Sequence, residues 1–284
     1  MRTYFDLFRI KHWIKNLIVF FPAFFGGVLF NQSNLFQLSI SFFYFSLAAS
    51  TVYLFNDLID YNQDKLHPKK KERPISSGKI SVRNSIIILI VMYITLILGS
   101  FIIDESVIII TVIYVFMNIL YTLFIKEIPI IELFIVAIGF VLRILLGAFT
   151  VQVVPSKWII IVAFFIALYL IVTKRRGEFL NTNFSARKVL KQYNIEFLNS
   201  LMYITLTLSL ISYLMYTLEV NVSERYHSDY IYITTIFVVL ILLRHLQQTI
   251  VYNKTESPIQ YFYTDKINFI AIIGFLTTFY FLIY

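Results

Sequence analysis

Long apolar runs dominate this chain of 284 residues and set the strongest limit on how it can fold. About nine of them reach the roughly 20 residues that an α-helix needs to cross a bilayer. These runs cover residues 16–32, 36–55, 84–103, 106–125, 129–150, 157–174, 198–218, 229–250 and 267–284. Hydrophobic residues make up 59% of the chain, against roughly 45–50% in soluble domains. The sequence therefore predicts an all-α, multi-pass transmembrane bundle of about nine helices.

Several runs are separated by only a few residues, which predicts antiparallel helical hairpins. No Pro/Gly-rich linker interrupts the pattern, so residues 1–284 are expected to form a single transmembrane domain. The absence of cysteine excludes disulfides, thiolate metal sites and a cysteine nucleophile. Residues 1–16 are too polar for a secretory signal peptide, so the first apolar run is expected to insert and remain in the membrane.

The formal net charge is +8, and the basic residues collect in the N-terminal segment and in every second loop. They are Arg2, Arg9, Lys11, Lys15, Lys65, Lys69, Lys70, Lys71, Arg73, Lys79, Arg83, Lys126, Lys174, Arg175, Arg176, Arg187, Lys188, Lys191, Lys254 and Lys266. The opposite loops carry Lys157 and Arg225. Such asymmetry predicts a cytoplasmic N-terminus and, with an odd number of spans, an external C-terminus. It explains the charge better than a nucleic-acid partner does.

An acidic segment, NDLIDYNQD, follows the second apolar run at its predicted cytoplasmic end. Asn56, Asp60 and Asp64 are spaced i, i+4 and i+8, and Asp57 lies seven residues before Asp64. On a helix these positions share roughly one face, where the carboxylates repel one another unless a cation binds. Oxygen ligands without His or Cys favour Mg2+. The alternative is a solvated helix end, but acids beside a membrane span are rare and usually functional.

A basic loop, KLHPKKKERPISSGKIS, comes next and contains two turns, at His67-Pro68 and Arg73-Pro74. Basic side chains beside an acidic metal site suit a phosphate or diphosphate. Arg73 is the strongest candidate because a guanidinium can bind phosphate through two hydrogen bonds. Setting the topology remains the alternative role for each lysine.

Two further groups of polar residues interrupt the apolar pattern. Lys126 and Glu132 lie at the start of the fifth run, and Arg143 lies about three helical turns further in. An intramembrane arginine needs either a ligand or a structural acidic partner. The segment TKRRGEF places Lys174, Arg175 and Arg176 after the sixth run, where a basic cluster can also serve only to stop transfer.

Together these segments resemble the UbiA superfamily of membrane prenyltransferases, and NDLIDYNQD is similar to the first acidic motif of that superfamily. The resemblance implies nine transmembrane helices around a central cavity, with acidic motifs on the cytoplasmic side. Within the superfamily, the chain is most similar to the decaprenyl-phosphate phosphoribosyltransferase branch. That similarity rests on RIKHWIKNLIVFFP (9–22), HPKKKERPISSG (67–78), LYTLFIKEIPIIELFIVAIGFVLR (120–143), TKRRGE (173–178) and SPIQYFYTD (257–265).

The resemblance implies an Mg2+-dependent transfer of 5-phosphoribose from phosphoribosyl diphosphate to a polyprenyl phosphate. It implies a bacterial-type cytoplasmic membrane and a product used for cell-envelope sugars. Asp57, Asp60 and Asp64 would bind the metal. The implied substrate-binding residues are Lys15, Asn56, Tyr61, His67, Lys71, Arg73, Tyr121, Lys126, Glu132, Arg143, Lys174, Arg175 and Arg176. Glu132 stands where the superfamily's second motif usually has aspartate, which puts a metal role there in doubt.

Two other functions are compatible with the sequence. An ordinary UbiA prenyltransferase would use the same acidic motif to ionise an allylic diphosphate and alkylate an aromatic ring. A transporter would also carry intramembrane charges, but transporters often contain internal repeats, and none is evident here. The number of separate basic segments favours the donor with more phosphates. Acceptor chain length and oligomeric state are left open.

Overall fold

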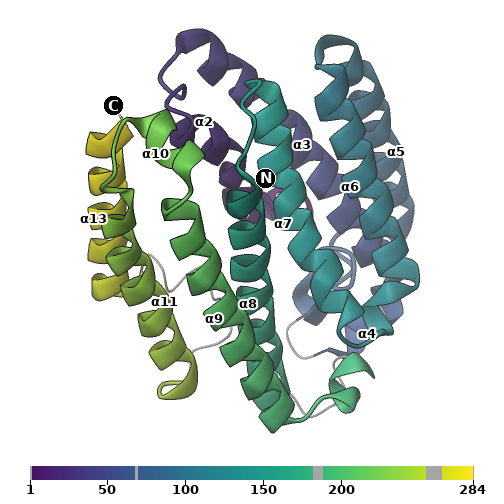
Figure 1. Ribbon diagram of the computed structural model, residues 1–284. Helices are drawn as coiled ribbons and strands as arrows, with labels where there is room; N and C mark the ends of the chain where they lie inside the picture. Colours follow the sequence, from purple (N-terminus) through teal and green to yellow (C-terminus); the bar gives the residue numbers. More distant parts are fainter. Residues whose placement is uncertain (1, 68–69, 182–187, 254–263, 284) are drawn as a thin grey trace. The chain divides into compact units, whose positions relative to one another are not determined.

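The computed structural model describes residues 2–67, 70–181, 188–253 and 264–283. Eight long α-helices form most of the protein (Figure 1). The long helices are α3 (Gln32–Ile59), α5 (Val82–Gly99), α6 (Glu105–Leu123), α7 (Ile131–Thr150), α8 (Lys157–Asn181), α9 (Ile195–Thr217), α11 (Thr234–Ile250) and α13 (Lys266–Ile283). All regular elements in the described residues are helices. The predicted all-α bundle is confirmed. Lys69, Arg187, Lys254 and most of segment 257–265 lie outside the described residues.

Short helices connect the long ones. They are α1 (Arg2–Leu7), η1 (Ile10–Phe20), α2 (Phe21–Phe25), α4 (Tyr61–Leu66), η2 (Lys70–Glu72), η3 (Ser100–Ile102), η4 (Ile125–Glu127), η5 (Lys188–Gln192), α10 (Val220–Tyr226) and η6 (Ile231–Ile233), where η marks a 3-10 helix.

The first predicted span, residues 16–32, does not form one long α-helix. In the described residues eight helices are long and apolar enough to cross a membrane, and the first of them is α3. The chain before α3 forms the 3-10 helix η1 and the five-residue α2. Pro22 has no N–H to donate to the carbonyl of Ile18, and the amide of Phe21 takes that carbonyl instead. The apolar run was read correctly, but its backbone conformation was not.

Polar residues between the apolar runs determine where several helices begin. The Asn31 side chain accepts a hydrogen bond from Ser33 N at the start of α3, and Ser81 accepts from Asn84 N at the start of α5. Asp104 caps α6 through Ser106 N, and Asn194 caps α9 through Phe197 N. Each cap satisfies an amide that the helix itself leaves without a partner.

The chain divides into two compact units, of which the first contains Met1–Lys126 and Leu142–Val154. Its core contains Val19, Phe45, Tyr114 and Leu146, which come from η1, α3, α6 and α7. Gly147 permits the close packing of α7 on η1, because a Cβ atom there would lie 1.9 Å from the carbonyl oxygen of Val19. The expectation of a single domain over residues 1–284 stays a prediction.

The second unit contains Glu127–Val141 and Pro155–Tyr284. Within it α8 packs along α9, and α11 packs along α13. Large buried side chains such as Tyr169, Met202 and Phe279 fill its interior. Two buried tyrosine hydroxyls are paired: Tyr213 Oη lies 2.6 Å from Thr234 Oγ1, and Tyr169 Oη lies 3.0 Å from Nδ1 of His245. Such pairing is required where a polar group is removed from water.

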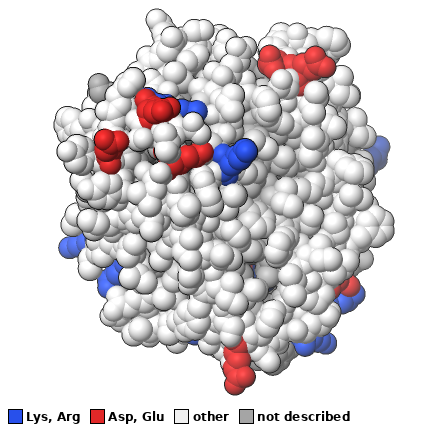
Figure 2. Space-filling view, in the orientation of Figure 1, with Lys and Arg blue, Asp and Glu red and all other residues white. Residues whose placement is uncertain are grey.

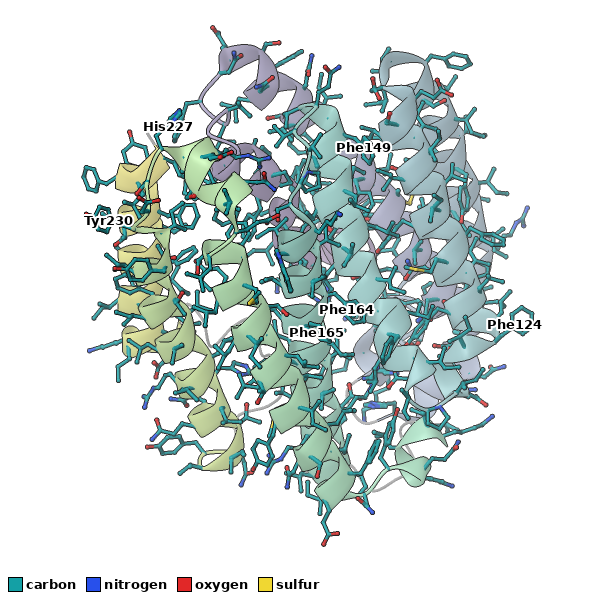
Figure 3. The ribbon with its side chains drawn as sticks, viewed as in Figure 1. Phe124, Phe149, Phe164, Phe165, His227 and Tyr230 are labelled. Carbon is teal, nitrogen blue, oxygen red and sulfur yellow. The ribbon has the colours of Figure 1, made fainter. Side chains whose placement is uncertain are left out.

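The outward surfaces of the long helices are apolar. On α5, Ile90, Ile97 and Leu98 are each more than half exposed. Charged side chains cover little of the face seen in Figure 2. Aromatic side chains such as Phe124 and Tyr230 project outward beside helix ends, as Figure 3 shows. An apolar exterior with aromatic residues near helix ends is typical of proteins that sit in lipid.

Candidate active site

The acidic segment lies where α3 ends and α4 begins. Asn56 and Asp57 lie in the last turn of α3, Asp60 separates the two helices, and Asp64 lies in α4. Asp57 and Asp64 are almost completely buried, at 2% and 1% exposure. Two carboxylates that are removed from water in this way require positive charges beside them.

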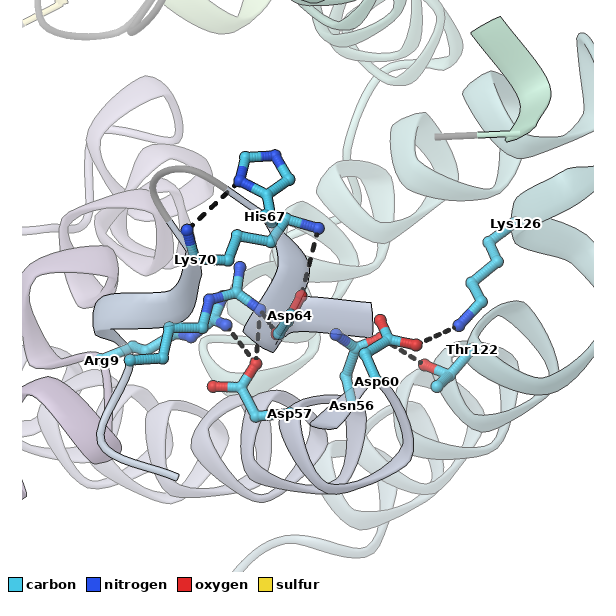
Figure 4. A network of polar contacts seen from close by, with 10 residues as sticks. Arg9, Asn56, Asp57, Asp60, Asp64, His67, Lys70, Thr122 and Lys126 are labelled. Carbon is cyan, nitrogen blue, oxygen red and sulfur yellow. Dashed lines mark hydrogen bonds and ion pairs between the residues drawn. The ribbon is translucent and has the colours of Figure 1, made fainter. Parts of the chain in front are cut away.

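Arginines supply that charge to Asp57 and Asp64. Arg73 Nη1 lies 2.9 Å from Asp57 Oδ1 and 2.5 Å from Asp64 Oδ2, so one guanidinium joins the two acids. Arg9 also donates to Asp57 Oδ1, and its guanidinium lies over the ring of Tyr53 at 4.8 Å. Arg9 adopts a left-handed backbone conformation directly before η1. Figure 4 shows the contact between Arg9 and Asp57 on the left side of this network.

Asp60 turns toward a different cation. Lys126 Nζ in η4 lies 2.5 Å from Asp60 Oδ1, a link across 66 residues of sequence (Figure 4). The hydroxyl of Thr122 donates to Asn56 Oδ1 at 3.3 Å and ties the end of α6 to the end of α3. The acidic segment is thus joined to the end of α6 and to Lys126 within the first unit.

The basic loop folds back on the acids. Lys70 Nζ lies 3.5 Å from Asp64 Oδ1, and the amide of Lys70 donates to Nδ1 of His67 at 3.2 Å. Tyr61 carries the ammonium group of Lys65 over its ring at 4.1 Å. Lys71 is exposed and lines a surface pocket with Asp6, Glu72 and Lys79. Tyr121 is half-buried on α6.

The acidic side chains do not form a ready-made ligand cluster. No group of three or more His, Cys, Asp or Glu residues placed to hold a metal occurs in the described part of the chain. Asp57 and Asp64 meet at Arg73, whereas Asp60 faces Lys126. The sequence predicted that a cation relieves the repulsion between the acids, and in the structure basic side chains of the chain pair with each of them.

Arg143 lies inside the first unit and is 5% exposed. Its Nε donates to Asn16 Oδ1 at 2.8 Å and its Nη2 donates to Tyr114 Oη at 3.1 Å. The guanidinium also lies 5.4 Å from the ring centre of Phe45 and 5.0 Å from that of Tyr114. The pKa of Lys15 is lowered to about 8 by burial and, after that, by the positive charges of Arg143 and Arg9. Two predicted binding residues therefore lie near each other.

Glu132 and Arg175 form a buried ion pair in the second unit. Nε and Nη2 of Arg175 each donate to one carboxylate oxygen of Glu132 at 2.7 Å. The Glu132 side chain has no exposed surface, and that of Arg175 is 4% exposed. Nη1 of Arg175 donates to Glu178 at 2.7 Å. Both residues were predicted to bind substrate, and the structure pairs them with each other.

Arg176 and Lys174 differ in burial. Arg176 is 6% exposed, with Nε donating to Asn199 Oδ1 at 2.7 Å and Nη1 to the carbonyl of Thr249 at 2.9 Å. Lys174 is far more exposed and lies 3.9 Å from Glu178. The three basic residues of the TKRRGEF segment thus have three different surroundings.

The sequence analysis missed several members of the network. Arg9 was counted only among the topology-setting residues, although it contacts Asp57. Asn16, Tyr114 and Thr122 looked like ordinary residues of apolar runs, yet they bind Arg143 or Asn56. A polar residue of this kind is recognisable only when its partner is known.

Comparison with known proteins shows similarity to one membrane-enzyme family. The model of the UbiA prenyltransferase family matches residues 19–273. The chain is 27% identical over 244 residues to decaprenyl-phosphate phosphoribosyltransferase of Mycobacterium tuberculosis H37Rv, covering 84% of this chain and 80% of that protein. It is 30% identical over 220 residues to the protein of the same name from Corynebacterium glutamicum, covering 75% and 66%.

Solved structures share the fold. A UbiA homologue from Archaeoglobus fulgidus, bound to DMAPP and Mg2+, superposes with a TM-score of 0.69 at 16% identity, covering 99% of both chains. The apo UbiA homologue from Aeropyrum pernix K1 gives 0.68 at 12% identity, covering 95% of this chain and 97% of that one. The predicted UbiA-like fold is confirmed, and with it a multi-pass membrane protein.

Proposed function

The chain belongs to the UbiA prenyltransferase family and is an integral membrane transferase, and we propose that it moves 5-phosphoribose from phosphoribosyl diphosphate to a polyprenyl phosphate. The observation that carries this proposal is the network in which Asp57, Asp60 and Asp64 are each held by a basic side chain. Carboxylates suit a divalent cation, and guanidinium and ammonium groups suit diphosphate oxygens. The mycobacterial and corynebacterial relatives, named for phosphoribosyl transfer, support this choice of substrates.

The oxygen atoms of the acidic segment have the chemistry that suits magnesium. Asp57, Asp60 and Asp64 offer hard carboxylate oxygens next to the amide of Asn56. Two of these acids are buried, and their charge is balanced by cations rather than dispersed in water. When bound, Mg2+ would neutralise charge on the leaving diphosphate. The UbiA homologue solved with DMAPP and Mg2+ supports the use of a divalent metal.

The basic side chains have a second role in this proposal. Arg73 and Lys126 form ion pairs with the carboxylates, and in this proposal they would bind phosphate oxygens of the donor. Moving from a carboxylate to a phosphate keeps each cation paired, so the exchange avoids the large cost of an isolated charge. Arg9 remains beside Asp57 and Tyr53 and positions that acid.

The reaction exchanges one bond at the anomeric carbon of ribose. The C1–O bond to diphosphate breaks and its electron pair leaves with diphosphate. A phosphate oxygen of the lipid then supplies the pair for the new C1–O bond. Positive charge develops on the sugar as the leaving group departs, as in other glycosyl transfers. The acceptor is already an anion, so the chain need not supply a strong general base.

A prenyl transfer to an aromatic acceptor is the second candidate. The homologues solved with DMAPP or GPP and Mg2+ favour it, since both ligands are prenyl diphosphates. One metal-bound diphosphate, however, needs fewer cations than a diphosphate plus a 5-phosphate and a lipid phosphate. Arg9, Lys70, Arg73 and Lys126 all gather within one unit, which favours the donor with more phosphates.

Replacing Arg73 by alanine is expected to weaken the binding of phosphoribosyl diphosphate by roughly tenfold to a hundredfold, because a charged contact contributes about 1.5–3 kcal/mol. Binding of phosphoribosyl diphosphate and of GPP to purified protein in magnesium measures this. Lys79→Ala is the control, since Lys79 is exposed in the same loop and outside the network. Tight binding and consumption of GPP, with no binding of phosphoribosyl diphosphate, would instead favour the second candidate.

The orientation in the membrane is also part of the proposal. The loop charges support a cytoplasmic N-terminus and a cytoplasmic acidic network, and the bacterial relatives support a bacterial-type inner membrane. Reporter fusions after Lys71 and Arg176 are expected to be cytoplasmic, and a fusion after Glu224 external. An external reporter at Lys71 would place the acidic network on the wrong side for a cytoplasmic donor.

A further inference from the structure

Lys15 is a partly exposed cation on η1 whose electrostatic neighbours are both positive. Within the described part of the chain, no hydrogen bond or ion pair to its ammonium group is present, and its electrostatic neighbours are Arg143 and Arg9. Burial and then these charges depress its pKa to about 8. An amine in such a position is costly for the protein and gains most from an anion that it can bind.

The neighbouring residues hold this region rigidly. Asn16, next to Lys15 in η1, accepts from Arg143 Nε at 2.8 Å and donates through Nδ2 to Ser46 Oγ at 2.9 Å. The hydroxyl of Tyr114 accepts from Arg143 at 3.1 Å. The Arg143 guanidinium therefore has a defined position before any ligand arrives, which lowers the entropic cost of binding.

The surroundings distinguish this region from the acidic network. The Arg143 guanidinium lies 5.4 Å and 5.0 Å from the ring centres of Phe45 and Tyr114, and both rings belong to the apolar core of the first unit. Arg9 lies near enough to Lys15 to affect its charge and also contacts Asp57. The positive region is thus adjacent to the acids on one side and enclosed by apolar side chains on the other. A ligand that suits it carries an anionic group on an apolar chain.

We propose that Lys15 and Arg143 bind the phosphate monoester of the lipid acceptor, with Asn16 and Tyr114 positioning the arginine. The assignment rests on the proposed function, and it places the acceptor phosphate beside the acids that hold the donor. A sugar 5-phosphate presents the same chemistry and would come from the donor. The apolar surroundings favour the lipid phosphate.

The test compares Lys15→Gln with Lys11→Gln, an exposed lysine of the same 3-10 helix. Binding of farnesyl phosphate, farnesol and ribose 5-phosphate to each purified protein is measured in detergent. Lys15→Gln is expected to weaken farnesyl phosphate binding by roughly tenfold to a hundredfold. Farnesol and ribose 5-phosphate binding should be unchanged, and Lys11→Gln should match the wild type.

Stability provides a second readout. Because the electrostatic neighbours of Lys15 carry the same charge, Lys15→Gln is expected to melt at or above the wild-type temperature, whereas loss of a structural lysine would lower it. Unchanged farnesyl phosphate binding in Lys15→Gln would overturn the assignment. Equal losses for ribose 5-phosphate would assign the site to the donor instead. Wild-type protein that transfers no phosphoribose would reject the proposed function, whereas normal transfer with an unchanged KM for lipid phosphate in Lys15→Gln would reject only this assignment.

Discussion

Asp64→Asn is expected to reduce turnover by at least about a hundredfold, which corresponds to about 2.7 kcal/mol of transition-state stabilisation. Asparagine has nearly the same volume as aspartate but lacks the charge that a metal-bound diphosphate requires. Asp64 is buried and forms ion pairs with Arg73 and Lys70. The substituted asparagine still offers a side-chain oxygen to Arg73, and Arg73 keeps Asp57. Folding should therefore be largely intact, and Asp60→Asn should behave in the same way.

Asp104→Asn is the matched control. Asp104 caps α6 by accepting from Ser106 N at 2.9 Å, and asparagine is an equally good cap. The same chemical change outside the network should leave turnover and the melting temperature near wild type. Initial rates at saturating magnesium measure the effect. Full turnover by Asp64→Asn, or an equal loss of turnover in Asp104→Asn, would contradict the proposed role of the acids in catalysis.

Arg175→Met and Glu132→Leu are each expected to destabilise the protein by about 3–5 kcal/mol, because either change leaves a buried charge without its main partner. The pair is closed by two hydrogen bonds of 2.7 Å and is almost wholly inaccessible to solvent. Combining the two changes removes both charges and restores an apolar interior of similar volume. The double variant is therefore expected to recover most of the lost stability.

Thermal unfolding of the purified variants in detergent checks this. Each single variant should melt lower than the wild type by about 5–15 °C. Glu178→Gln is the control, since Glu178 contacts the same arginine but is 27% exposed in its side chain. Single variants that melt like the wild type would contradict a bracing role. A double variant that is stable but inactive would show that the pair also contacts substrate, as the sequence predicted.

The long helices were predictable because burial in lipid requires long apolar runs, and several of their starts were visible as capping residues such as Asn31 and Asn194. The conformation of residues 16–32 was not predictable in this way. A 3-10 helix and an α-helix can both form from the same apolar residues. The change from η1 to α2 depends on Pro22 together with the packing of Gly147 against Val19.

The acidic motif was also visible, because its spacing is local. Two of its partners, Arg9 and Lys126, were not visible because they come from distant parts of the chain, whereas Arg73 lies in the loop directly after the motif. Arg9 lies 48 residues from Asp57, Lys126 lies 66 from Asp60, and Arg175 lies 43 from Glu132. Helix packing decides which basic residue reaches which acid. Sequence alone could identify the charged residues and not which of them are already neutralised.

The central claim is the identity of the donor, and one product assay tests it most directly. Purified protein is incubated with ribose-labelled phosphoribosyl diphosphate, a polyprenyl phosphate and magnesium. The proposal predicts a labelled, solvent-extractable lipid and one released diphosphate for each label transferred, both lost in chelator. Absence of labelled lipid with any polyprenyl phosphate, while the same preparation consumes GPP in the presence of an aromatic acceptor, would contradict it.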